Sequence, residues 1–378
     1  MSRKRTIDAF FGAASAGAPE PKKPCDIATG SPETHLDGLN TNGNGLKELD
    51  AVIAPGTAAR KSDDYSTHPA YPFPIPHLPS ALAAELPSWP ASLGRVINDQ
   101  PDLDLLYFEP YVVRGGGSAR SLFEFLRSEL PFYRVEYDIN RGGTSTHIRT
   151  PRWTTVFGLD DTSRFSSSSS SGGGGGSGGG EDITKILDVK TGRDVSADKF
   201  YTRYKPRPIP KCLDDLRLSA QVAAGCEFNF CLVNYYASGA DSISFHSDDE
   251  RFLGPLPAIA SFSLGARRDF LLKHKPIPPP PGGEHTEAMR NATSKPLKLP
   301  LASGDMVLMR GLTQANWLHS IPKRTGKNAT DGGRINITFR RALVKPGTDN
   351  YYNYNVGTGP VYKWDAVSRE MRPWKKIL

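Results

Sequence analysis

Two residues that could hold a metal ion stand two positions apart in the chain, His246 and Asp248. Because successive side chains of an extended strand point to opposite sides, residues two apart point to the same side. An imidazole and a carboxylate then face one point in space. With a second histidine they would complete the triad that holds non-haem Fe(II) and leaves positions open for substrate and oxygen. Such pairs also occur by chance in surface turns, so the interpretation depends on a third ligand.

The third ligand is expected from a distant strand, and His319 is the candidate. Shortly after it, residues 334–340 alternate polar and apolar side chains, as a strand with two different faces does. The polar face carries four residues, Arg334, Asn336, Thr338 and Arg340. Arginines on a strand face that turns towards a core need anions to meet them, and guanidinium groups bind carboxylates bidentately. The pattern predicts a small dicarboxylate that chelates the metal.

Taken in order, these motifs resemble the AlkB family of Fe(II)- and 2-oxoglutarate-dependent dioxygenases. The motifs that carry the resemblance are Asn234-x-Tyr236, His246-x-Asp248, His319 and Arg334-x5-Arg340. The longer strings at 228–234, 246–250 and 261–270 are most similar to the eukaryotic DNA-repair branch. The resemblance runs from about residue 105 to about residue 345, with insertions.

The resemblance implies a cofactor set of Fe(II), 2-oxoglutarate and O2. The metal ligands would be His246, Asp248 and His319. The distal carboxylate of 2-oxoglutarate would pair with Arg334, helped by Asn234 and Tyr236, and Arg340 would hold the metal-bound end. The co-substrate residues are therefore Asn234, Tyr236, Arg334, Asn336, Thr338 and Arg340. The implied reaction is oxidative demethylation of bases such as N1-methyladenine and N3-methylcytosine in nuclear DNA, with release of formaldehyde and succinate.

Substrate contacts are expected from a hairpin and the strand that follows it. Residues 135–139 alternate as a strand, 140–143 form a turn and 144–149 return. In the DNA-repair AlkB proteins this region forms a nucleotide-recognition lid, followed by an aromatic residue that stacks on the damaged base. By position this residue is Phe157, which could instead be part of the core. The other substrate candidates are Arg152, Asp249 and Glu250, although both carboxylates could simply be solvated.

Many short strands punctuated by glycine and proline predict a mainly β fold with supporting helices, a double-stranded β-helix or jelly-roll. We expect a dioxygenase domain over 76–350, interrupted by a serine- and glycine-rich insertion at 166–180 and a proline-rich one at 276–300. Residues 1–75 contain few aromatic residues and are predicted to be disordered. Residues 351–378 form an aromatic, basic tail that the pattern does not place.

Composition restricts the partners. The net charge of +7 fits a polyanionic partner such as nucleic acid without establishing one. We expect no membrane partner, because no apolar run has the length of a membrane span. None of the four cysteines forms a CxxC pattern, which favours reduced thiols in an intracellular protein. Near the start, Ile7, Phe10 and Phe11 resemble the motif that binds the DNA sliding clamp, although Lys4 stands where that motif prefers glutamine.

Two other interpretations stay open. The substrate could be methylated RNA or a protein rather than DNA. Alternatively, the chain could be a non-catalytic nucleic-acid-binding module built on the same fold. Such a module would be expected to have lost metal ligands, and all three are present in this chain.

Overall fold

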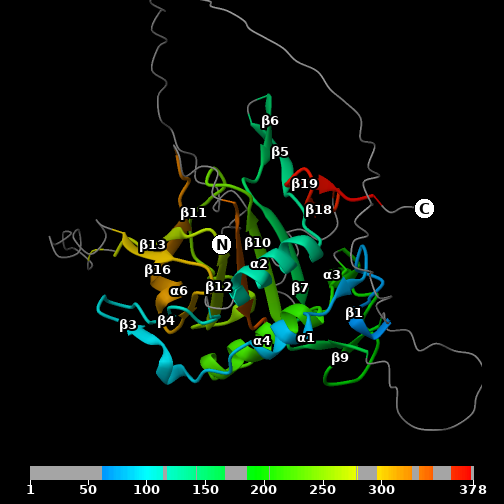
Figure 1. Cartoon of the computed structure of the whole chain (residues 1–378), viewed down its shortest axis with the longest axis horizontal. Coiled ribbons are helices and arrows are strands. Elements are labelled where there is room, and N and C mark those ends of the chain that lie inside the picture. The colour runs from blue at the N-terminus through cyan, green and yellow to red at the C-terminus, as the bar shows by residue number, and fades with distance from the viewer. Residues whose placement is uncertain are drawn as a thin grey trace, which may run out of the picture. The chain divides into compact units, whose positions relative to one another are not determined.

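In the computed structural model, residues 62–113, 117–141, 143–166, 185–203, 205–277, 279, 296–325, 332–343 and 359–375 are described. Strands predominate among them (Figure 1). The expected clamp-binding motif at Ile7, Phe10 and Phe11 lies outside these residues. So do residues 167–184, which include nearly all of the serine- and glycine-rich insertion, and the larger part of the proline-rich one.

The helices are α1 (Ser80–Ala84), α2 (Ser118–Glu129), α3 (Lys199–Arg203), α4 (Lys211–Ala224) and α6 (Thr313–Asn316). The first strands are β1 (Tyr65–Ser66), β2 (Ile75–Pro76), β3 (Arg95–Ile97), β4 (Leu105–Phe108), β5 (Glu136–Arg141), β6 (Thr144–Arg149), β7 (Trp153–Gly158), β8 (Ser163–Phe165) and β9 (Ile186–Asp188). The later strands are β10 (Phe230–Tyr236), β11 (Ile243–His246), β12 (Ile259–Gly265), β13 (Arg268–His274), β14 (Leu297–Leu301), β15 (Met306–Met309), β16 (Trp317–Ile321), β17 (Arg334–Arg340), β18 (Tyr362–Asp365) and β19 (Glu370–Pro373).

Two antiparallel sheets form the body of the domain. The major sheet has seven strands in the order β3-β4-β15-β12-β17-β10-β7, and the minor sheet has four in the order β11-β16-β13-β14. Strands distant in sequence are neighbours in both, because the chain passes repeatedly from one sheet to the other. This arrangement confirms the predicted mainly β, jelly-roll architecture.

The central strands β12, β17 and β10 of the major sheet are buried on both faces. On one face Leu232 packs between the sheets in a cluster that also holds Leu272 of β13. On the other face Val233 packs in a second cluster, with Leu122 of α2 and Leu216 of α4. The layers are therefore helices, major sheet and minor sheet, and we call the two clusters the helix-side core and the inter-sheet core.

The predicted alternation of β17 is confirmed. Ile335, Ile337 and Phe339 lie in the helix-side core. Their polar neighbours are buried as well, on the face that turns towards the minor sheet. Because the side-chain period of a strand is two, this register directs both arginines of β17 to the inner face of the sandwich.

The ordered domain begins earlier than the expected boundary at residue 76. A compact unit starts at Ser62, and β1 pairs with β2. Tyr71 and Ile75 are buried in the helix-side core. The aromatic and proline-rich stretch at 71–76 therefore has apolar surface to bury.

Two further segments contain paired strands. Strand β14 begins at Leu297, inside the predicted proline-rich insertion, and pairs with β13. In the C-terminal tail, β18 and β19 pair as a hairpin and Met371 enters the helix-side core.

The serine- and glycine-rich segment joins two paired strands, since β8 pairs with β9 and the amide of Ser166 donates to the carbonyl of Lys185 (2.9 Å).

Candidate active site

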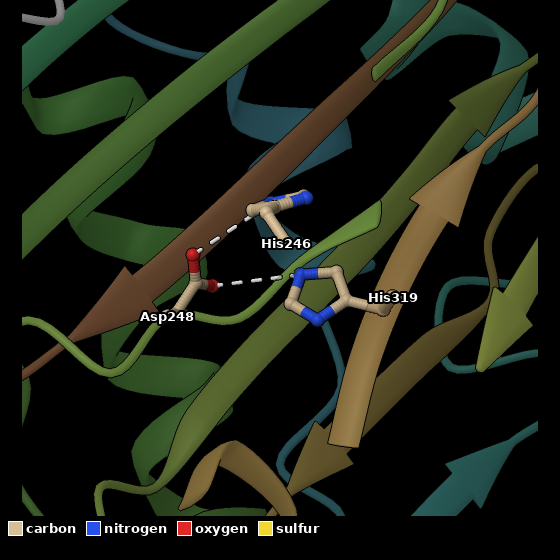
Figure 2. A group of neighbouring side chains, drawn as sticks. All are labelled: His246, Asp248 and His319. Atoms are coloured by element: carbon tan, nitrogen blue, oxygen red, sulfur yellow. Dashed lines mark ion pairs between the residues drawn. The ribbon is translucent and has the colours of Figure 1, made fainter. Parts of the chain in front are cut away.

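The two histidines of the predicted triad lie directly opposite each other on neighbouring strands of the minor sheet. His246 ends β11 and is the register partner of His319 in β16. Directly opposed residues of an antiparallel pair place their side chains on the same face, and the two ring centroids are 4.2 Å apart. Asp248 follows just beyond β11, where its backbone amide donates to Oε1 of Gln314 (2.9 Å). The structure thus brings all three residues together (Figure 2).

The ligand atoms face one another. Nε2 of His246 lies 3.9 Å from Oδ1 of Asp248, and Nε2 of His319 lies 3.8 Å from Oδ2 (Figure 2). One candidate ligand atom from each residue lies within 4.8 Å of the other two. The Nδ1–H of His246 donates to the carbonyl of Ser244 (2.9 Å), which leaves Nε2 to bind a metal.

The protonation states suit a divalent metal. Burial lowers the pKa of both histidines, and that of His319, which also faces His246, falls to about 3. Burial alone would raise the pKa of Asp248, but the positive charge of Arg340 outweighs it, so the pKa lies below its usual value. Two neutral imidazoles and one carboxylate anion are the donor set that non-haem Fe(II) takes, so the residues fit this metal.

Arg340, at the end of β17, fixes the carboxylate ligand. Its Nη2 lies 2.9 Å from Oδ2 of Asp248, and its Nη1 lies 3.7 Å from Oε1 of Glu250. All three side chains are buried. A buried charge is stable only when paired, so this arrangement holds Asp248 ionised and in a fixed orientation.

Arg334, at the other end of β17, reaches the same inner face. It is 1% exposed, and its Nη2 donates to Oγ of Ser263 in β12 (2.7 Å). Its guanidinium carbon lies 5.5 Å from the ring centroid of Tyr236, which is its register partner in β10. Ser263 was not among the predicted site residues. The alternation of Ser261 and Ser263 along β12 was the signal that could have identified it.

The remaining predicted co-substrate residues lie on the same inner face. Asn336 donates to Oγ of Ser261 (2.9 Å) and to the carbonyl of Phe262 (2.8 Å). Thr338 donates to the carbonyl of Leu232 (3.2 Å). These contacts tie β17 to its neighbours on both sides. That Asn336 and Thr338 contact a co-substrate stays a prediction.

Arg152 meets the site from the short connection between β6 and β7. It is buried, and its Nε donates to Oδ1 of Asn234 (3.1 Å). Its positive charge contributes to the lowered pKa of His246. Of the two carboxylates predicted to contact substrate, Glu250 is buried beside Arg340, whereas Asp249 is exposed and pairs with Lys275 (3.1 Å).

Phe157, for which both base stacking and a place in the core were open, lies in the core. It pairs in register with Cys231 and lies in the helix-side core, 1% exposed, with the ring of Tyr71 edge-on at 6.1 Å. Its neighbour Val156 lies in the inter-sheet core. Both faces of β7 are buried, so the alternation of the sequence did not reveal which face turns to the site.

Sequence reasoning also missed Arg268, which opens β13 and is almost fully buried. Its Nη2 donates to the carbonyls of Asp241 (2.8 Å) and Pro322 (2.7 Å). Asp241 lies just before β11, which carries His246, and Pro322 lies just after β16, which carries His319. Arg268 therefore joins the two segments that carry the histidines. The string 261–270 that contains it entered only through the family resemblance.

Comparisons with known proteins agree with this geometry. Residues 185–340 match the model of the 2OG-Fe(II) oxygenase superfamily. "DNA oxidative demethylase ALKBH2" of Arabidopsis thaliana is 35% identical over 158 residues, 38% of this chain and 48% of that protein. Human "Alpha-ketoglutarate-dependent dioxygenase alkB homolog 3" is 38% identical over 149 residues, 39% of this chain and 49% of that protein. Human "DNA oxidative demethylase ALKBH2" is 38% identical over 139 residues, 37% of this chain and 49% of that protein.

The chain thus spans about half the length of the curated relatives it matches. A solved structure, "The structure of OsALKBH1", aligns with 65% of this chain and all of that chain at 15% identity, with a TM-score of 0.33. The site and the sequence matches bear out the resemblance to Fe(II)- and 2-oxoglutarate-dependent dioxygenases over the matched part of the chain. The curated relatives that match are named as AlkB homologues of eukaryotes, so the similarity is to that branch.

Proposed function

We propose that this protein is an Fe(II)- and 2-oxoglutarate-dependent oxidative demethylase that repairs N-alkylated bases in DNA. The observation that carries the proposal is the cluster of His246, Asp248 and His319, with Arg340 beside the carboxylate and Arg334 further along the same strand face. The names of the ALKBH2 relatives, DNA oxidative demethylases, support DNA as the substrate.

The three ligands would hold the iron, and Arg340 keeps Asp248 ionised and oriented for it. With 2-oxoglutarate and dioxygen, bound Fe(II) supplies the oxidation that hydroxylates an N-methyl carbon, giving a hemiaminal that releases formaldehyde while the co-substrate becomes succinate and carbon dioxide. Asp248 and the neutral histidines contribute by offering lone pairs without first losing a proton.

Arg334 is the residue that would bind the distal carboxylate of 2-oxoglutarate. Its guanidinium is buried on the inner face beside Ser263 and the ring of Tyr236. An anion that enters this position gains charge-assisted hydrogen bonds where water is excluded. Asn234, the neighbour of Arg152, would help to position the co-substrate on the same face.

The target base would have to leave the DNA stack, because Asp248 and His319 of the ligand cluster are buried. Arg152 and Glu250 lie close enough to the ligand cluster to orient such a base. Asp249 lies at the surface and could contact the nucleotide only if it exchanges its partner Lys275. Phe157 has no place in this scheme, because it lies in the helix-side core.

Action on nuclear DNA is part of this proposal. The segment with Ile7, Phe10 and Phe11 supports recruitment to the sliding clamp, since two aromatic side chains following an aliphatic one can form the three apolar anchors of one helical turn. A fluorescence-anisotropy titration of the purified clamp with a peptide of residues 1–20 tests this part. Equal binding after Phe10→Ala would contradict it.

The decisive experiment measures formaldehyde release from oligonucleotides that carry N1-methyladenine or N3-methylcytosine. Single- and double-stranded DNA and RNA are compared, with Fe(II) and 2-oxoglutarate present. We expect release from DNA by the wild-type protein and none by His319→Ala. Release from RNA alone would favour an RNA demethylase, and binding of all substrates without release would favour a non-catalytic binding module.

A further inference from the structure

The C-terminal hairpin, β18–β19, lies against the base of the β5–β6 hairpin (Figure 1). The amide of Phe132 donates to the carbonyl of Tyr362 (3.0 Å), and the amide of Tyr362 donates back (2.6 Å). The next residue, Tyr133, exchanges the same two bonds with Thr154 of β7 (2.9 and 2.8 Å). The segment that enters β5 is therefore held between the edge of the major sheet and the C-terminal hairpin.

Aromatic side chains fix this contact. The ring of Trp364 lies under the guanidinium carbon of Arg127 from α2 at 3.9 Å, and edge-on to Tyr235 at 6.2 Å. The ring of Tyr362 lies edge-on to Trp153 at 6.4 Å. Cation–π and edge-to-face contacts of this kind depend on geometry, so they fix the position of the C-terminal hairpin on the domain.

The same cluster holds both ends of the β5–β6 hairpin. Arg134, just before β5, lies over Trp153 at 4.4 Å and donates from Nε to the carbonyl of Thr150, just after β6 (3.0 Å). Among the described residues, β5 and β6 pair only with each other, and the hairpin projects from the body (Figure 1). Its direction is therefore set at its base.

The exit of the β5–β6 hairpin runs directly into the candidate active site. The carbonyl of Pro151 accepts from the amide of Ser242 (3.1 Å), and Arg152 donates to Asn234. A shift at the base of the hairpin would therefore change both its projection and the position of Arg152. Among the described residues, the contacts of the C-terminal hairpin given above involve none of the three candidate metal ligands.

We propose that the C-terminal hairpin is a brace that fixes the direction of the β5–β6 hairpin beside the active site, and that Trp364 is its main positioning residue. The brace acts on substrate capture and leaves the metal cluster unchanged. The expected effect on the capture of alkylated DNA rests on the proposed function. The expected effect on the mobility of the β5–β6 hairpin does not, because it can be measured without substrate.

The test uses the full chain with three substitutions. Trp364→Ala removes the ring of the cation–π contact. Arg127→Gln removes its cation, which belongs to α2 and not to the C-terminal hairpin. Val367→Ala is the matched control, because Val367 lies at the tip of the same hairpin and is 96% exposed. Hydrogen exchange of the amides of residues 136–149 reports the mobility of the β5–β6 hairpin. The KM for alkylated DNA and the 2-oxoglutarate turnover without DNA report function.

We expect exchange at 136–149 to become roughly tenfold faster in both brace variants, which corresponds to the loss of one partly desolvated cation–π contact. The control should match the wild type. The KM for DNA should rise by a similar factor while turnover without DNA is unchanged. If Trp364→Ala lowers the melting temperature of the whole domain, its faster exchange could come from general destabilisation. The exchange rates of Arg127→Gln then decide whether the brace exists.

Unchanged exchange at 136–149 in folded Arg127→Gln would overturn the brace, and so would an equal acceleration in Val367→Ala. If exchange becomes faster in Trp364→Ala and Arg127→Gln but the wild-type protein demethylates no substrate, the proposed function is refuted while the brace stands. The two failures are thus distinguishable.

Discussion

Replacing Phe157 by alanine gives a sharp test of its position. The side chain is 1% exposed in the helix-side core, with Tyr71 at its edge and the guanidinium of Arg207 5.0 Å from its ring centroid. Truncation of a fully buried phenylalanine costs about 3–5 kcal/mol, because the transfer free energy is lost and a cavity remains. We therefore expect Phe157→Ala to lose about that much unfolding free energy, a large part of the roughly 5–15 kcal/mol of a typical domain.

The assay is urea unfolding followed by circular dichroism. The midpoint should fall while the slope with urea stays the same, since the surface exposed on unfolding hardly changes. Val189→Ala is a matched control at an exposed valine, and its effect should stay within about 0.5 kcal/mol. Phe157→Tyr adds a hydroxyl to an apolar site, and we expect it to cost about 1–3 kcal/mol where no hydrogen-bond partner can be recruited.

A base-stacking role makes opposite predictions for both variants. Phe157→Ala would remain as stable as the wild type and would fail only on alkylated DNA. Phe157→Tyr would be tolerated, because an aromatic face would remain. Either result would refute the assignment of Phe157 to the core.

The other predictions concern the site and the insertion. His246→Ala, Asp248→Ala and His319→Ala should each abolish formaldehyde release with the circular dichroism spectrum unchanged, and wild-type turnover with normal iron content in any of them would disprove the metal assignment. Arg334→Ala should raise the 2-oxoglutarate concentration for half-maximal turnover roughly a hundredfold or more, because one partner of a buried charge pair is lost. An unchanged co-substrate titration would mean that another residue binds the distal carboxylate. Deletion of 166–180 should leave turnover and melting temperature close to wild type, since closing a loop depends only weakly on its length, and loss of folding would show otherwise.

Local patterns were the part of the fold that could be predicted. The alternation of β17 is a property of seven consecutive residues, and it correctly separated Arg334 and Arg340 from the isoleucines between them. The same holds for α2, whose apolar residues recur at helical spacing, and for the β5–β6 hairpin with its glycine turn. Period and turn chemistry determine such elements without reference to the rest of the chain.

Non-local contacts could not be predicted from physical pattern alone. Nothing in the two segments themselves shows that His246 and His319 are register partners, and only the family resemblance suggested that they meet. The face of β7 was not predictable, because both of its faces are buried. The C-terminal hairpin has ordinary strand composition, and its partner Phe132 lies far away in the sequence.

The pairing of β8 with β9 has a consequence beyond this domain's own stability. Phe165 and Ile186 are register partners, and the amide of Ser166 donates to the carbonyl of Lys185, so the chain leaves and re-enters the body at nearly one point. The spacing of these two anchor points is set by the strands and does not depend on the residues between them. This junction is therefore suited to receive a guest domain whose own termini lie close together. A fluorescent reporter spliced in there would keep both strands in register and leave the metal-binding strands β11 and β16 as they are.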